Sequence, residues 1–208
     1  MSARLYLFTP TLDDTAAFAR TLERALAAAD IAAVLLRLAD ADERALINRI
    51  KTVAGVVQRR DVALLVEGRP ELVARAGADG AHLTGIEALH AALPALKPDR
   101  IAGAGGLRSR HDAMLAGETA ADYVMFGEPD RRGPGKNPPF AAVEERVAWW
   151  AELFQPPCIG YASSADQIGP LAQAGADFVA LGEWIWSEPT GVERVLAAAA
   201  QSLSAAAG

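Results

Sequence analysis

The sequence contains a single cysteine, no run of basic residues and no long apolar stretch. The one thiol, Cys158, excludes both an internal disulfide framework and a metal cluster built from cysteines. Lys and Arg number 20 against 26 Asp and Glu, so the formal net charge is −6. This acidic balance gives no general case for nucleic acid or for an anionic membrane as a partner.

The sequence also shows no pattern typical of export or membrane insertion. Residues 1–4 lead directly into an apolar run of about five residues, without the charged and apolar regions of a signal peptide. No apolar stretch approaches the ~20 residues of a transmembrane helix. We therefore expect a cytoplasmic protein.

Three stretches of the chain repeat one pattern: small residues, an Asp, and a short apolar run that stops at Gly or Thr. They are Ala76–Thr84, Ala120–Gly127 and Ala174–Gly182. In two copies a Gly ahead of the Asp can take the left-handed conformation that ends a helix. The apolar run is short enough to be a strand buried on both faces. Each copy therefore predicts a helix, a tight turn and a buried strand, with the Asp where the strand begins.

Eight apolar segments alternate with eight helical patterns along the whole chain. The expected strands are 5–9, 33–38, 62–66, 80–83, 100–104, 123–127, 157–161 and 178–182, and the expected helices are 12–29, 41–55, 70–77, 86–96, 109–117, 141–153, 164–174 and 188–204. Such alternation implies a parallel sheet. We predict one (β/α)8 TIM barrel domain over residues 1–208, with a doubly wound open sheet as the alternative.

Helix-start residues support these boundaries. Asp42, Ser109 and either Ser163 or Ser164 stand where N-caps belong, and Pro70 falls in a first helical turn, where its missing N–H costs nothing. The stretch 128–139 is rich in Pro and Gly and too long for a tight turn, so it is expected to be a functional loop.

Active sites of such barrels gather at the carboxyl ends of the strands. Arg37 interrupts an apolar run there and would be costly to bury alone; it either contacts an anionic substrate or pairs with a carboxylate such as Glu67. His82 is either an acid–base group or a hydrogen-bonded core histidine. His90 and His111 lie in helical patterns and are expected to face solvent.

Several residues at these strand ends suit a phosphate ligand. Lys136, flanked by glycines, can place an ammonium over the open barrel, or it is a solvated loop lysine. Gly160 and Gly182 follow the last two strands, where these barrels commonly bind phosphate. Glu183 would repel a phosphate, so either its side chain points away or no phosphate binds beside it.

Two carboxylates are candidates for a metal site. Glu67 and Glu87 follow neighbouring strands and can share Mg²⁺, although surface glutamates need no such role. Among the aromatic residues, the pair Trp149–Trp150 is expected to pack between helices and barrel, or to mark a subunit contact in a homodimer. Trp184 is placed to line a pocket.

The order of these pieces resembles the thiamine phosphate synthase family and its relatives, the TenI-type thiazole tautomerases. Ala76–Leu83 is similar to the family's A-x-G-A-D-G-V-H-L, and Ala174–Leu181 to its A-G-A-D-G-V-A-V. Asp122–Gly127 is close to the D-Y-V-x-F-G of the tautomerase branch. The resemblance runs from about Leu35 to Trp186 and implies a barrel that joins a pyrimidine diphosphate to a thiazole phosphate with Mg²⁺, releasing pyrophosphate.

The resemblance carries over to ligand residues unevenly. Arg37 matches the arginine of the family's Q-L-R, Arg69 the arginine after the third strand, and Lys136 the lysine of T-x-T-K. Glu87 aligns with a metal-binding Asp, and Glu67-Gly68 with the family's Asn-Asp. Substitutions stand elsewhere: Thr84-Gly85 for Gly-Gln, Gly105 for a serine, Gly160-Tyr161 within I-G-G-I, Glu183 for a second serine, and Leu107 for the tautomerase histidine.

We therefore expect a thiamine-phosphate-synthase-like transferase with a small-molecule phosphate ligand. The expected catalytic residues are Arg37, Lys136 and His82; the expected phosphate contacts are Arg69, Gly105, Gly106, Gly160 and Gly182; the expected metal ligands are Glu87 and Glu67. The alternatives are a binding or regulatory barrel without turnover and another small-molecule isomerase, using His82 or Glu128.

Overall fold

The computed structural model describes residues 3–129, 138–188 and 191–206, and it shows a closed ring of eight parallel strands. The strands are β1 (Arg4–Leu12), β2 (Ile31–Leu38), β3 (Ala63–Glu67), β4 (Gly80–Thr84), β5 (Ile101–Gly105), β6 (Tyr123–Phe126), β7 (Cys158–Ala162) and β8 (Phe178–Leu181). Each strand pairs with its sequence neighbours, and β8 returns to pair with β1. This closure confirms the predicted TIM barrel and excludes the open sheet.

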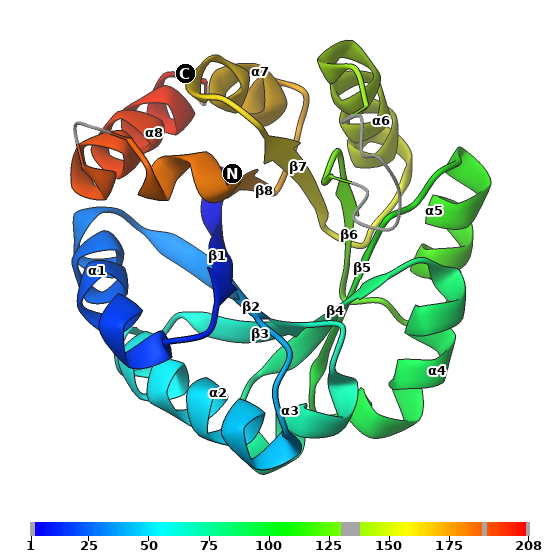
Figure 1. Ribbon diagram of the computed structural model, residues 1–208. Helices are drawn as coiled ribbons and strands as arrows, with labels where there is room; N and C mark the ends of the chain where they lie inside the picture. The colour runs from blue at the N-terminus through cyan, green and yellow to red at the C-terminus, as the bar shows by residue number, and fades with distance from the viewer. Residues whose placement is uncertain (1–2, 130–137, 189–190, 207–208) are drawn as a thin grey trace.

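Helices surround the ring on its outer side (Figure 1). They are α1 (Thr15–Ala28), α2 (Glu43–Val57), α3 (Pro70–Ala76), α4 (Ile86–Leu96), α5 (Arg110–Glu118), α6 (Phe140–Leu153), α7 (Ile168–Gln173) and α8 (Val192–Ala206), with short 3-10 turns η1 (Gln58–Arg60), η2 (Ala165–Gln167) and η3 (Glu183–Trp186). No described helix is long and apolar enough to cross a membrane.

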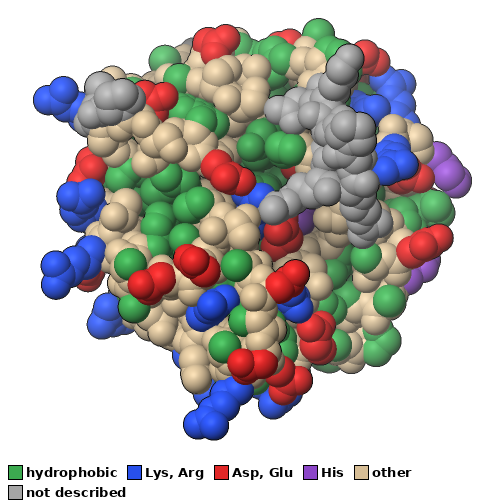
Figure 2. Space-filling model, in the orientation of Figure 1, with side chains coloured by type: hydrophobic (Ala, Val, Ile, Leu, Met, Phe, Trp, Pro, Cys, Tyr) green, Lys and Arg blue, Asp and Glu red, His purple; other side chains and the backbone are tan. Residues whose placement is uncertain are grey.

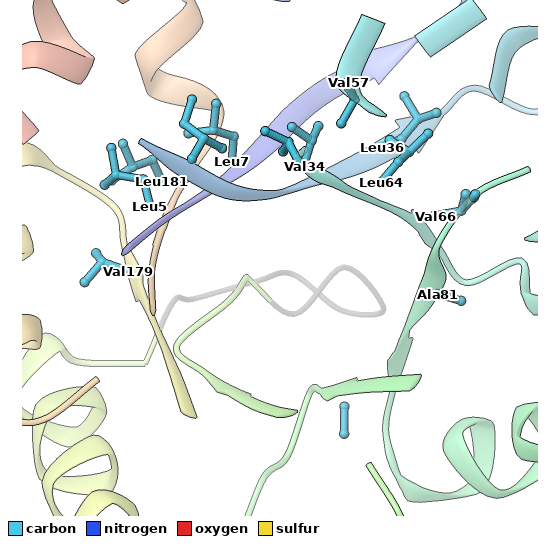
Figure 3. Packing of buried hydrophobic residues seen from close by; sticks show 14 of the residues in the cluster. Leu5, Leu7, Val34, Leu36, Val57, Leu64, Val66, Ala81, Val179 and Leu181 are labelled. Atoms are coloured by element: carbon cyan, nitrogen blue, oxygen red, sulfur yellow. The ribbon is translucent and has the colours of Figure 1, made fainter. Parts of the chain in front are cut away.

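The buried hydrophobic residues form two separate cores, one between the strands and the helices and one inside the ring of strands. On β1, Leu5 and Leu7 belong to the large cluster between barrel and helices, whereas Tyr6 and Phe8 belong to a smaller cluster inside the barrel. Figure 3 shows part of the outer cluster, including Val57 of α2. Side chains alternate across a strand, so a strand buried on both faces reads as a continuous apolar run.

The three repeated Asp residues form matching contacts at the amino ends of the strands. The carboxylate of Asp79 accepts a hydrogen bond from the N–H of Leu64 at 2.7 Å, that of Asp122 from Ala102 at 2.7 Å, and that of Asp177 from Cys158 at 2.8 Å. In each case the Asp backbone N–H returns a bond to the carbonyl of the same partner residue. Each Asp therefore ties its strand to the preceding one, on the face opposite the strand ends where sites form.

Most predicted boundaries hold within a few residues, with exceptions at the first strand and at the seventh helix. The first strand extends to Leu12, beyond the expected Thr9, and the helix expected over 164–174 is divided into η2 and α7. Asp42 and Ser109 cap α2 and α5 as predicted, whereas Ser164 precedes η2 without a side-chain capping bond. Here the Ser163 hydroxyl bonds the side chain of Gln167 instead.

Candidate functional site

A cavity of about 420 Å³ opens at the carboxyl ends of the strands. Its walls come from strands β1, β2, β3, β4 and β7 and from the segments that follow β6 and β8: Phe8, Arg37, Glu67, His82, Thr84, Glu128, Pro129, Tyr161 and Glu183. We call it the central pocket. It contains three carboxylates against one guanidinium and one imidazole, so its fixed charges favour cations and hydrogen-bond donors over anions. Red and blue side chains lie close together near the middle of the face shown in Figure 2.

Arg37 is held from three sides. Its side chain is only 8% exposed; Nε lies 3.5 Å from a carboxylate oxygen of Glu67, and Nη1 pairs with Glu183. The Arg37 backbone N–H donates to the Thr9 hydroxyl at 3.0 Å, which fixes the strand end that carries it. Of the two alternatives for Arg37, the structure displays the ion pair, and Glu183 joins Glu67 as its partner.

A buried chain of hydrogen bonds crosses the barrel interior to the pocket. The Tyr6 and Tyr123 hydroxyls lie 3.0 Å apart, and the Tyr123 hydroxyl lies 2.8 Å from His82 Nδ1. His82 Nε2 lies 3.2 Å from Glu128 Oε2. His82 is 2% exposed, so it is a hydrogen-bonded histidine of the core and a wall of the pocket at the same time.

The tyrosines of the barrel interior keep their protons throughout the neutral range. Burial raises the pKa of Tyr6 and Tyr123 well above the usual value for a phenol, and the nearby carboxylate of Glu128 raises both pKa values further. Burial also raises the pKa of Tyr161 to about 12, although the charge of Arg37 acts in the opposite direction. All three hydroxyls are therefore neutral hydrogen-bond donors.

Gly105 leaves the space that Glu128 fills. A Cβ built on Gly105 would overlap both carboxylate oxygens of Glu128 and Nε2 of His82. The next residue, Gly106, has a φ of +61°, where a side chain would be strained. These two predicted phosphate contacts therefore have packing reasons to be glycine, and their phosphate role stays a prediction.

A second cavity of about 790 Å³ adjoins the central pocket and shares Thr84, Glu128 and Pro129 with it. We call it the side pocket. Its walls include Glu87, Arg108 and Arg146, together with the first residues of α4. Arg146 donates to the backbone carbonyls of Leu107 and Arg108. The side pocket therefore carries two guanidinium groups that the sequence did not mark as ligand contacts.

The other predicted residues lie around these pockets or outside the described part of the chain. Arg69 pairs with Asp40 at 2.6 Å and lines neither cavity. A Cβ on Gly160 would approach Leu171 to 2.7 Å, and one on Gly182 would overlap the Tyr161 hydroxyl. Both glycines therefore leave space for a neighbouring side chain, and their phosphate role stays a prediction. Lys136 lies outside the described residues.

Metal-binding residues are not assembled in the described ranges, which contain no group of three or more His, Cys, Asp or Glu side chains able to hold an ion. Glu67 lines the central pocket and Glu87 the side pocket. These donors therefore do not form a preformed cage, and a metal role for either carboxylate stays a prediction.

The remaining sequence predictions concern histidines and tryptophans. His90 and His111 are exposed, as expected, and Trp150 is fully buried between α6 and the barrel. The Trp184 indole N–H donates to the Ala162 carbonyl at 3.0 Å, and the residue lines neither cavity, contrary to expectation.

Known proteins have the same fold, and several of them are also similar to this chain in sequence. The family model for thiamine monophosphate synthase matches residues 5–185. A thiamine-phosphate synthase of Rhodospirillum centenum is 42% identical over 190 residues, 90% of this chain and 91% of the relative; one of Hyphomonas neptunium is 36% identical over 90% and 88%.

A solved structure, the thiamine phosphate pyrophosphorylase of Pyrococcus furiosus, has a TM-score of 0.80 at 20% identity and covers 99% of this chain and 97% of its own. It supports the fold alone. The match over 5–185 and the identity across nine-tenths of the chain show the family. The chain belongs to the thiamine monophosphate synthase family.

Proposed function

We propose that the protein is a thiamine-phosphate synthase, which joins a pyrimidine diphosphate to a thiazole phosphate and releases pyrophosphate. The observation that carries this proposal is the 42% identity to a protein of that name across nine-tenths of both chains. We assign the reaction to the two cavities at the carboxyl ends of the strands, because active sites of such barrels lie at that face.

The charged side chains of the two cavities suggest which part of the substrates each cavity binds. Release of pyrophosphate needs cations against the leaving group. Arg37 is already paired with Glu67 and Glu183, so the central pocket is better suited to a neutral ring than to a diphosphate. The side pocket is lined by two guanidinium groups, Arg108 and Arg146, as well as by carboxylates, and we assign the anionic groups to it because it offers one guanidinium more than the central pocket. Arg69, Gly105, Gly106, Gly160 and Gly182 remain proposed phosphate contacts, and Lys136 a proposed catalytic cation.

We propose that Mg²⁺ binds together with the diphosphate substrate. In proteins Mg²⁺ usually keeps several waters and is held by one or two carboxylates together with substrate phosphates. Glu87, in the side pocket, is the carboxylate placed for that role. The ion would neutralise charge on the leaving diphosphate.

Pyrophosphate release tests the proposal directly. The full chain is incubated with the pyrimidine diphosphate, the thiazole phosphate and Mg²⁺, and pyrophosphate is measured with a coupled enzyme. We expect release that depends on both substrates. Thermal stabilisation by each ligand alone is measured beside it, because binding without release would contradict the synthase assignment.

A barrel that binds these ligands without turnover is the second candidate. The observation in its favour is the pairing of Arg37 with Glu183, which occupies a cation that the family resemblance assigns to catalysis. Ligand-induced stabilisation without any pyrophosphate would support this candidate.

A further inference from the structure

Glu128 has a buried carboxylate of which only one oxygen is hydrogen-bonded among the described residues. Its side chain is 9% exposed, and Oε2 meets His82 Nε2 at 3.2 Å. Oε1 is buried and has no hydrogen-bond partner among the described residues. A buried, unsatisfied carboxylate oxygen is costly, and this one belongs to a wall of the central pocket.

The hydrogen-bond chain behind Glu128 has a preferred direction. If Tyr6 donates to Tyr123 and Tyr123 donates to His82 Nδ1, then His82 carries its proton on Nε2 and donates it to Glu128 Oε2. The reverse direction would set an unprotonated Nε2 against a carboxylate, two acceptors facing each other. In this direction the chain supplies a donor to Glu128 Oε2 and leaves Oε1 as an acceptor.

Gly105 maintains this arrangement, because the carboxylate occupies the volume that any side chain at position 105 would need. His82 and Tyr123 stack at 5.8 Å between ring centroids with a 16° interplanar angle, which limits rotation of the imidazole. The position of Oε1 is thus determined by packing on one side and by hydrogen bonds on the other.

We propose that Glu128 Oε1 determines substrate specificity by accepting a hydrogen bond from an amino group on a neutral heteroaromatic ring bound in the central pocket. His82 and Tyr123 are positioning residues for this contact, and Gly105 provides its space. This inference rests on the proposed function, since the ring belongs to a substrate of that reaction. It adds the chemical group on the ring that the central pocket recognises.

Two ring fragments of equal size test the proposal on the full chain. 4-Aminopyrimidine carries the donor, and 4-methylpyrimidine replaces it with a methyl group. Dissociation constants are measured by NMR titration. The wild type is expected to prefer the amino compound by at least about tenfold, the usual value of a hydrogen bond to a charged acceptor.

Variants then assign the preference to Glu128. In Glu128→Gln, the side-chain carbonyl stays on His82 and the amide N–H groups face the pocket, so the preference should fall to about one. Gly105→Ala should have the same effect by displacing the carboxylate, with circular dichroism confirming the fold. The control Glu152→Gln, on the exposed end of α6, should keep the wild-type ratio.

Equal affinities in the wild type, no binding of either fragment, or a ratio unchanged in Glu128→Gln would each overturn the inference. Pyrophosphate release separates this result from the proposed function. Release without an amino preference contradicts the role of Glu128 alone, whereas an amino preference without release contradicts the synthase and leaves the contact standing.

Discussion

What a charged side chain of the site can bind depends on its ion-pair and hydrogen-bond partners as well as on its own charge. Arg37 is nearly buried and neutralised by Glu67 and Glu183. His82 is held between Tyr123 and Glu128. A free guanidinium would attract a phosphate, but this one already has two carboxylates within reach. The electrostatics of the central pocket therefore depend on which partners are present.

Removal of one carboxylate partner of Arg37 should increase the affinity of the central pocket for anions. In Glu183→Gln, Arg37 loses a charged partner while the side chain keeps its size, so the guanidinium can attract an added anion. We expect inorganic pyrophosphate to raise the melting temperature of this variant more than that of the wild type. Equal shifts in the two proteins, with Glu152→Gln as the control, would contradict this account.

Glu87 gives a second prediction at the scale of one residue. If it holds the Mg²⁺ that enters with the diphosphate, Glu87→Ala should lose most of the Mg²⁺ dependence of pyrophosphate release. The measurement is the rate of release against Mg²⁺ concentration. An unchanged dependence would remove Glu87 from the site.

Cys158 should be unreactive in the folded protein. It is fully buried, and burial together with the charge of Asp177 raises the pKa of its thiol to about 12. The thiolate is the reactive form, and a raised pKa keeps the thiol protonated up to strongly alkaline pH. Modification by an aromatic disulfide reagent at pH 8 should be slow, and fast after unfolding in guanidinium chloride. Rapid reaction of the folded chain would contradict the buried position.

At the scale of the elements, the barrel is built from repeated strand-to-strand connections. Asp79, Asp122 and Asp177 each join the start of one strand to the strand before it, by a side-chain bond and a backbone bond to the same residue. The turn ahead of Asp79 uses Gly77 in a left-handed conformation, with φ of +74°. The repeats therefore stabilise the barrel and leave its opposite face to the ligand.

Loss of one such contact should lower stability without changing the site. Asp79→Ala removes the acceptor for the Leu64 N–H, and a hydrogen bond to a charged group contributes about 1–3 kcal/mol. Urea unfolding should show a loss of that size. Fragment binding at the central pocket should be unchanged; a large loss of binding with unchanged stability would contradict the structural role.

At the scale of the whole molecule, closure makes every strand an interior strand. β1 pairs with both β2 and β8, so the described barrel has no unpaired edge. The outer core is shared by all eight helices. A single continuous core of this kind is expected to unfold cooperatively.

Two groups of tryptophans allow this cooperativity to be measured. Trp149 and Trp150 lie in α6, and Trp184 and Trp186 lie in η3 on another part of the ring. If residues 1–208 form one domain, tryptophan fluorescence and far-ultraviolet circular dichroism should give coincident urea transitions. Separate transitions would indicate two folding units.

The sequence by itself determined the fold, because the signals for a barrel are local. The alternation of apolar runs with helical patterns, the caps at Asp42 and Ser109, and the Asp repeats each lie within a few residues of the element they specify. The family follows for the same reason, since the motifs that carry it are those local segments.

Only the tertiary structure decided the site. Glu183 is 146 positions from Arg37, and Tyr123 is 41 positions from His82, yet each pair is joined directly. No local pattern indicates that the glycine at 105 leaves room for the carboxylate at 128. Contacts between strand ends depend on barrel closure and register, which bring together residues that are far apart in the chain and show no spacing signal within it.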